Sequence, residues 1–248
     1  MGMKRRCFLL TGLAAAAGGG ILRAEESAMA EGTRAFMEGK IEEALRHWDR
    51  QIAEDPESGP HHWQRGLALY YAGRYKEGRE QFEAHRKVNP EDVENAAWHF
   101  LCVARQESPA AARKVFIPIG RDGRVPMKEI HALYAGTGTV EAVRAAAEVG
   151  AEEPVAGGGG DPANAAKPAS DAKNVSGESP RPRKISAGEL RNQRCYSGLY
   201  LGLYHEVMGD AAKAEKAMVE AAGKYRMDHY MGKVAQVHCQ LRGWKIPV

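Results

Sequence analysis

Histidines are the side chains in this chain best suited to hold a metal ion, but their spacing is poor for that task. His205, His229 and His238 would converge only if the last two helical hairpins packed suitably. His61 and His62 are adjacent, and neighbouring side chains on a helix point in different directions. The sequence also contains no nucleophile elbow, HExxH or paired-cysteine metal motif. We therefore expect no metal, no cofactor and no catalysis. A metal-dependent enzyme using the C-terminal histidines is a distant alternative.

Cysteine chemistry offers two interpretations. Beyond residue 24 the cysteines are Cys102, Cys195 and Cys239, so at least one is unpaired within the chain. A Cys195–Cys239 bridge is one interpretation, because both residues fall in predicted C-terminal helices. Buried free thiols are the favoured one, since free cysteine is often buried in helical cores.

The charge distribution argues against nucleic-acid binding. The formal net charge is +3, but Lys4, Arg5, Arg6 and Arg23 lie in a segment (1–24) without acids. The remainder of the chain is therefore at −1, and no basic surface for a polyanion is expected.

The segment 1–24 has the pattern of an export signal. A basic start is followed by a glycine- and alanine-rich apolar stretch that is short for a membrane span. Arg5-Arg6 before Phe8-Leu9 resembles the twin-arginine motif, and the general secretory route is the alternative. We expect cleavage near Ala24 and a periplasmic or envelope location. No stable membrane anchor is expected, since Cys7 precedes the apolar stretch and is badly placed for lipidation.

Small residues and aromatics recur in phase along the remaining chain. In the clearest copy, Gly66 and Gly78 allow two helices to approach, Phe82 fills the gap between them, and Pro90 ends the second helix. Gly39, Gly73 and Gly209 mark the turns between paired helices. The repeat-defining residues are Gly32, Ala44, Trp48 and Pro56; Gly66, Gly78, Phe82 and Pro90; Phe100, Ala112 and Phe116; and Gly202, Ala214 and Met218.

This pattern is similar to the tetratricopeptide repeat (TPR), a helix-turn-helix unit of about 34 residues. The expected fold is an all-α TPR superhelix, an α-α solenoid. Helices are predicted at 27–38, 41–54, 60–72, 75–88, 91–106, 108–116, 127–135, 140–149, 186–208, 210–225 and 228–241, with a capping box at Ser186–Glu189.

The composition divides the chain into four parts. Residues 150–185 are nearly all Gly, Ala, Pro, Ser and charged residues, so we predict a disordered linker. It separates TPR repeats and short helices (25–149) from C-terminal TPR-like helices (186–248). The latter are too small to hold a core alone, so we expect them to pack back on the solenoid.

The first helix of each TPR pair lines the concave face, which predicts a partner-binding groove. Its aromatic side chains are the kind that anchor peptides. For Phe36 and Leu67, core and groove positions remain equally open. The groove residues in the three N-terminal copies are Met29, Thr33, Phe36, Met37, Trp63, Leu67, Tyr70, Tyr71, Ala97, Leu101, Ala104 and Arg105.

Three stretches resemble the NlpI-like TPR proteins of the bacterial envelope: Arg65–Arg74, Asn89–Arg105 and Tyr196–Met218. The resemblance implies a non-catalytic adaptor for envelope proteases or peptidoglycan enzymes. We therefore expect an exported adaptor that binds a protein or peptide in its groove. The alternative is a scaffold of an envelope assembly that acts through its convex face. The sequence leaves oligomeric state open.

Overall fold

The computed structural model describes residues 28–151 and 184–247, and within them every regular element is helical, which confirms the all-α prediction. A first helix spans 28–37. The later elements are α2 (Ile41–Glu54), the 3-10 helix η1 (Pro56–His61), α3 (Trp63–Tyr71), α4 (Tyr75–His85), α5 (Val93–Gln106), α6 (Pro109–Lys114), α7 (Met127–Ala135), α8 (Val140–Ala146), α9 (Ala187–Val207), α10 (Ala211–Ala222) and α11 (Tyr230–Arg242).

Local capping chemistry explains several helix ends. The Ser186 side chain accepts from the Glu189 amide, and the Glu189 carboxylate accepts from the Ser186 amide, so the predicted capping box is confirmed. Gly39, Gly73 and Gly209 have positive φ angles of 75°, 74° and 87°. Each glycine reverses the chain between two helices in a conformation that other residues adopt at a cost.

Several predicted helix bounds differ from the structure. The helices predicted from 91 and 228 begin at Val93 and Tyr230, and those predicted to end at 88, 149 and 225 end at His85, Ala146 and Ala222. The largest error in a helix start is at α3. The sequence predicts a helix from residue 60, but α3 begins at Trp63, after a separate 3-10 helix, η1. Pro56 and Pro60 both lie in η1 and lack the backbone N–H that a continuous α-helix would use. The result is a tight turn between α2 and α3.

The predicted repeat pairs are in contact. A methyl group on Gly32 would lie 2.4 Å from Trp48 Nε1, and one on Gly66 would lie 2.6 Å from the Phe82 ring. A methyl group on Gly202 would lie 2.9 Å from the Met218 methyl, and the Phe100 and Phe116 ring centroids are 5.9 Å apart. The same sequence separation therefore produces a close helix–helix contact three times, and in the fourth copy Phe100 of α5 meets Phe116, which lies just after the end of α6. The alanine repeat positions Ala44, Ala112 and Ala214 are fully buried, whereas Pro56 and Pro90 are exposed.

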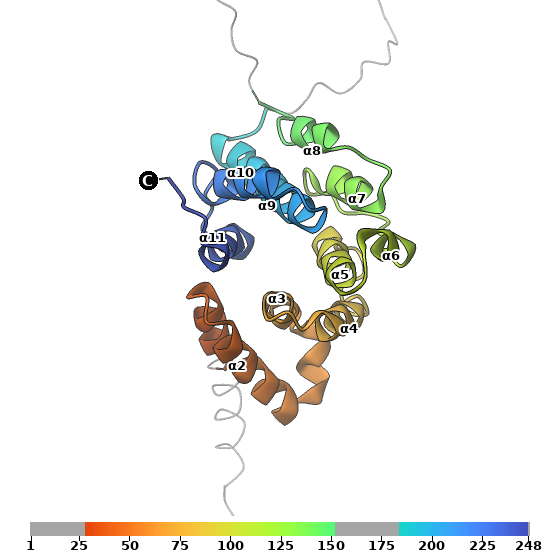
Figure 1. The fold of residues 1–248 in the computed structure, drawn as a ribbon, viewed down its shortest axis with the longest axis vertical. Helices are drawn as coiled ribbons and strands as arrows, with labels where there is room; N and C mark the ends of the chain where they lie inside the picture. The colour runs from red at the N-terminus through yellow and green to blue at the C-terminus, as the bar shows by residue number, and fades with distance from the viewer. Residues whose placement is uncertain (1–27, 152–183, 248) are drawn as a thin grey trace, which may run out of the picture.

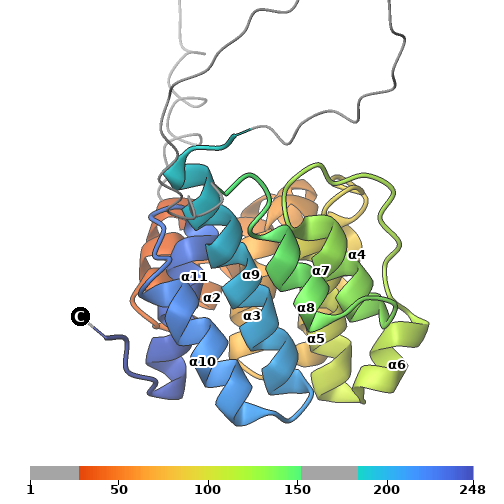
Figure 2. The same cartoon turned by 90° about the horizontal axis from the view of Figure 1, so that it is seen from above.

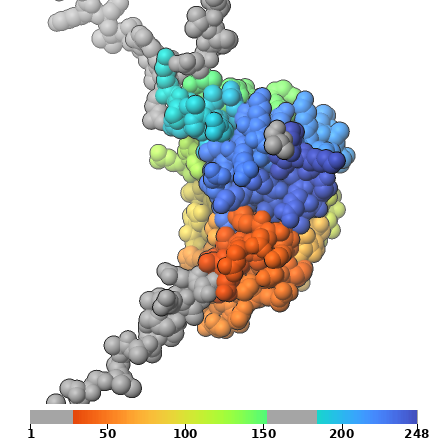
Figure 3. Space-filling model, turned by 90° about the vertical axis from the view of Figure 1, so that its left-hand side faces the viewer, coloured from red at the N-terminus to blue at the C-terminus, as the bar shows by residue number. Residues whose placement is uncertain are grey.

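The helices follow one another around an arc, which brings α11 back beside the first helices (Figure 1). Seen from above, α7, α8, α9 and α10 lie in front of α2, α3 and α4 (Figure 2). The C-terminal helices lie directly against the N-terminal ones on the face shown in Figure 3. Packing of α9 on α5, α7 and α8 connects the two described parts of the chain, and the Tyr134 hydroxyl donates to the Tyr200 carbonyl at 2.8 Å.

The predicted signal (1–24) and nearly all of the predicted linker (150–185) lie outside the described residues. In the described parts, no helix combines the length and the apolar character needed to cross a membrane. Cys102, Cys195 and Cys239 are buried free thiols, which is the favoured of the two cysteine interpretations.

Candidate binding site

Helix α11 lies against part of the predicted groove, at Phe36, Trp63 and Tyr71. Its Tyr230 stacks on Phe36 with 6.0 Å between ring centroids and meets Trp63 edge-on at 4.8 Å. The Tyr71 hydroxyl is hydrogen-bonded to His238 at 3.0 Å. A helix of the chain itself therefore lies where the sequence places a partner, and it removes apolar surface from water there.

Several predicted groove residues are core residues in the structure. Phe36, Leu67 and Tyr70 are at most 2% exposed. This places Phe36 and Leu67 in the core, which the sequence left open. Ala97, Leu101 and Ala104 are buried as well. Met29, Thr33, Met37, Trp63, Tyr71 and Arg105 are partly exposed.

Arg105 belongs to an ion-pair cluster that attaches α11 to the rest of the molecule. Its guanidinium lies 3.0 Å from a carboxylate oxygen of Glu206, and Glu206 also pairs with Arg242 on α11. His238 Nε2 lies 3.6 Å from the same carboxylate. The Glu206 carboxylate is mostly buried, so this cluster contributes to the packing of α11 against α5 and α9.

The C-terminal histidines do not form a common site. His229 contacts Asn192, His238 contacts Tyr71, and His205 packs against Tyr204. Among residues 28–151 and 184–247, no group of three or more His, Cys, Asp or Glu side chains is arranged to hold a metal ion.

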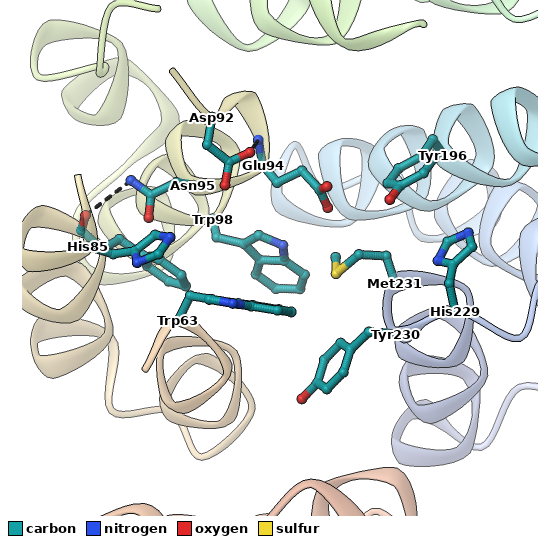
Figure 4. A pocket seen from close by; sticks show the side chains of 11 residues that line it. Trp63, His85, Asp92, Glu94, Asn95, Trp98, Tyr196, His229, Tyr230 and Met231 are labelled. Carbon is teal, nitrogen blue, oxygen red and sulfur yellow. Dashed lines mark hydrogen bonds between the residues drawn. The ribbon is translucent and has the colours of Figure 1, made fainter. Parts of the chain in front are cut away.

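A cavity of about 260 Å³ remains open between α3, α4, α5, α9 and α11 (Figure 4). Of the predicted groove residues, Trp63 lines it. The cavity is lined by Trp63, Phe82, His85, Asp92, Glu94, Asn95, Trp98, Tyr196, His229, Tyr230 and Met231. It has the mixed apolar and polar lining of a small binding site.

Carboxylates and one arginine form a charged cluster beside the cavity. The Arg124 guanidinium lies 2.7 Å from Asp92 and 2.6 Å from Asp122, and it also pairs with Glu94. Three acids therefore share one base, and the cluster has a surplus of negative charge. We call Asp92, Glu94, Asp122 and Arg124 the acidic cluster.

Glu94 is the member of the acidic cluster that points toward the centre of the cavity in Figure 4. Its second carboxylate oxygen accepts from the Tyr200 hydroxyl at 2.7 Å, and its side chain is 13% exposed. Burial raises the pKa of Glu94 to about 7, and Asp92 adds to the effect, while Arg124 opposes it. The carboxyl group thus changes charge near neutral pH.

The two histidines of the cavity are engaged by hydrogen bonds. His85 Nδ1 donates to the Pro60 carbonyl at 2.8 Å. His229 caps α11 by accepting from the Gly232 amide through Nδ1, so its Nε2 donates to Asn192 at 2.7 Å. Burial lowers the pKa of His229, which keeps that ring neutral at pH 7.

Three buried polar atoms of lining residues have no hydrogen-bond partner within the described residues, and one of them, the Tyr230 hydroxyl, points away from Glu94 in Figure 4. The other two are Oδ1 of Asn95, an acceptor, and Nε1 of Trp98, a donor. Both residues are at most 4% exposed, and the Trp98 nitrogen faces the open space near Glu94 (Figure 4). Buried polar atoms normally have hydrogen-bond partners. A ligand that brings a donor for Asn95 Oδ1 and an acceptor for Trp98 Nε1 would therefore complement the cavity.

Sequence reasoning missed most of this site. Trp98 and Glu94 lie on the helix predicted at 91–106, where the apolar periodicity was the visible signal. Tyr196 and Tyr230 come from helices far along the chain, and their spacing in the sequence gives no sign that they meet Trp63.

The comparisons with known proteins add no relative. A scan against family models finds no match, and a search of curated proteins finds none.

Proposed function

We propose that this chain is an exported, non-catalytic TPR-type adaptor that binds a protein or peptide partner in the cavity between α3, α5 and α11. The recurring contacts of Gly32 with Trp48, Gly66 with Phe82 and Gly202 with Met218 support a TPR-type superhelix. The resemblance to NlpI-like proteins extends the proposal to partners such as envelope proteases or peptidoglycan enzymes.

The observation that carries the proposal is the aromatic pair at the cavity, Trp63 and Tyr230. Both side chains are half-buried, and they meet edge to face with 4.8 Å between ring centroids. Half-buried aromatics beside a cavity supply large contact area at low entropic cost when a partner arrives. The position also suits an adaptor, because α11 already lies against Phe36 and Tyr71 beside it.

Selection of peptides on the full-length protein tests this proposal. Peptides from a random display library are enriched on the wild type and then measured against Trp63→Leu and Tyr230→Leu. We expect both variants to weaken binding about tenfold or more, as for other aromatic anchors. Circular dichroism and urea unfolding establish that each variant is folded.

Tyr225→Leu is the matched control. Tyr225 is also partly exposed, but it lies after α10 against Arg194 and Lys224, away from the cavity. Binding should be unchanged in this variant. If the enriched peptides bind all four proteins equally, the cavity is not their site, and a scaffold acting through the convex face becomes the better interpretation.

A further inference from the structure

We propose that the cavity recognises a lysine side chain of the partner, with the ammonium group held among the aromatic rings beside the acidic cluster. This inference rests on the proposed binding function and names the chemistry of the bound residue.

Aromatic faces supply the first part of the argument. Four aromatic side chains line the cavity, one each from α3, α5, α9 and α11 (Figure 4). They are Trp63, Trp98, Tyr196 and Tyr230. Such rings attract a cation through their negative faces, most strongly for tryptophan. Met231 and Phe82 complete the wall and can pack against the apolar stem of a lysine.

Charge complementarity supplies the second part. The acidic cluster contributes Asp92 and Glu94 to the cavity lining, whereas none of the lining residues in the described chain is Lys or Arg. His229 is kept neutral by burial and by its two hydrogen bonds. A cation therefore enters a region of negative potential, and an anionic side chain would be repelled.

The unpartnered atoms decide between kinds of cation. A primary ammonium carries three N–H donors and can satisfy Asn95 Oδ1, whereas a quaternary ammonium has none. Nε1 of Trp98 needs an acceptor, which a peptide carbonyl next to the lysine provides. A guanidinium suits the site less well, because it needs a fork of acceptors and Arg124 already occupies the carboxylates of the acidic cluster.

Calorimetric titration of the full chain with short peptides tests the inference. The probes are acetyl-Gly-Lys-Gly-amide and its analogues with norleucine or trimethyl-lysine in place of lysine. We expect the lysine peptide to bind at least about tenfold more tightly than the norleucine peptide, the size of a partly desolvated cation–π contact with charge support. Equal affinity for the two peptides would show an apolar pocket and overturn the proposal.

The trimethyl-lysine peptide should bind more weakly than the lysine peptide, because it cannot donate to Asn95. Tighter binding of the trimethylated form would overturn the primary-ammonium assignment in favour of a quaternary cage. n-Butylamine should bind at least tenfold more weakly than the peptide, since it brings no carbonyl for Trp98. If n-butylamine binds equally well, a free amine rather than a protein lysine is the ligand, and the proposal fails.

Glu94→Gln tests the charge contribution with little change in shape. It should weaken the lysine peptide severalfold and leave the norleucine peptide unchanged. Glu80→Gln is its control, since Glu80 is an exposed residue of α4 that does not line the cavity. Unchanged lysine binding in Glu94→Gln would remove the acidic cluster from the proposal.

Wild-type affinity for the lysine peptide should rise between pH 6 and pH 8 as Glu94 ionises, and affinity for the norleucine peptide should not. The groups that face Glu94 are Asp92, Asp122 and Arg124 in the acidic cluster and Tyr196 and Tyr200 on α9. His85 on α4 and His229 on α11 line the same cavity. A flat profile for the lysine peptide would count against the inference.

The two proposals can fail separately. If library peptides depend on Trp63 but lack lysine, and replacing their basic residues has no effect, the binding function stands and the lysine inference is wrong. If the enriched peptides ignore Trp63 and Tyr230, the cavity function itself is wrong.

Discussion

The side chains of Tyr71 and His238 are hydrogen-bonded at 3.0 Å although 167 residues separate them in the chain. Nε2 of His238 faces the Glu206 carboxylate, so we assign the ring proton to Nε2 and an accepting role to Nδ1. The Tyr71 hydroxyl then donates to that nitrogen. This contact joins α3 of the N-terminal part to α11, the last helix, inside a largely buried aromatic cluster.

Removing the Tyr71 hydroxyl should weaken the packing of α11 against α3. Tyr71→Phe leaves Nδ1 of the fully buried His238 without its donor, which costs about 1–3 kcal/mol of unfolding free energy. Urea unfolding measures the change. Tyr75→Phe is the control, because the Tyr75 hydroxyl makes no hydrogen bond within the described residues, and it should change stability by less. Equal losses for the two variants would contradict the prediction.

His238 should make the fold sensitive to mild acid. Burial lowers its pKa from 6.5 to about 4, with Arg242 and Arg105 adding to the effect and Glu206 opposing it. Between these values the unfolded chain binds a proton that the folded chain does not, so stability falls as pH decreases from about 6.5 to 4. The decrease in unfolding free energy that is attributable to His238 over this range is at most about 3 kcal/mol.

Comparison of wild type with His238→Asn isolates this contribution. The variant should be less stable at pH 7, but its unfolding free energy should change less between pH 6.5 and pH 4. Parallel stability curves for the two proteins would show that His238 titrates normally in the folded state.

The helix approach at Gly66 should not tolerate a side chain. In Gly66→Ala the new methyl would lie 2.6 Å from the Phe82 ring, so α3 and α4 must move apart. We expect a loss of about 1–3 kcal/mol, typical of overpacking, seen as a lower melting temperature. Gly188→Ala in the exposed first turn of α9 meets nothing closer than 3.8 Å and should be neutral or slightly stabilising. A stable Gly66→Ala protein would show that the repeat contact is not tight.

The export prediction concerns residues outside the described structure. Replacing Arg5 and Arg6 by lysine should leave uncleaved precursor in the cytoplasm if the twin-arginine route is used. Cell fractionation and immunoblotting measure the distribution, with wild type as the reference. Normal export of the double variant would assign the protein to the general secretory route.

The sequence by itself determined the helices and their pairing with near neighbours. The repeat phase placed α2, and the flanking loop residues placed α7, at their observed bounds, and Ser186 and Glu189 marked the start of α9. The spacing from Gly66 to Phe82 also predicted a close contact that the structure contains. These features depend on residues within a few helical turns, so the pattern along the chain is enough to predict them.

Only the tertiary structure decided what lies in the predicted groove. The curvature that brings Tyr230 against Phe36 and Trp63 accumulates over many small helix–helix angles, and no local pattern specifies their sum. For the same reason, the cavity joins Glu94 and Trp98 to Tyr196 and Tyr230 from distant helices. The sequence indicated an aromatic groove, whereas packing within the chain buried half of its predicted residues and left open a cavity where aromatic rings and carboxylates meet.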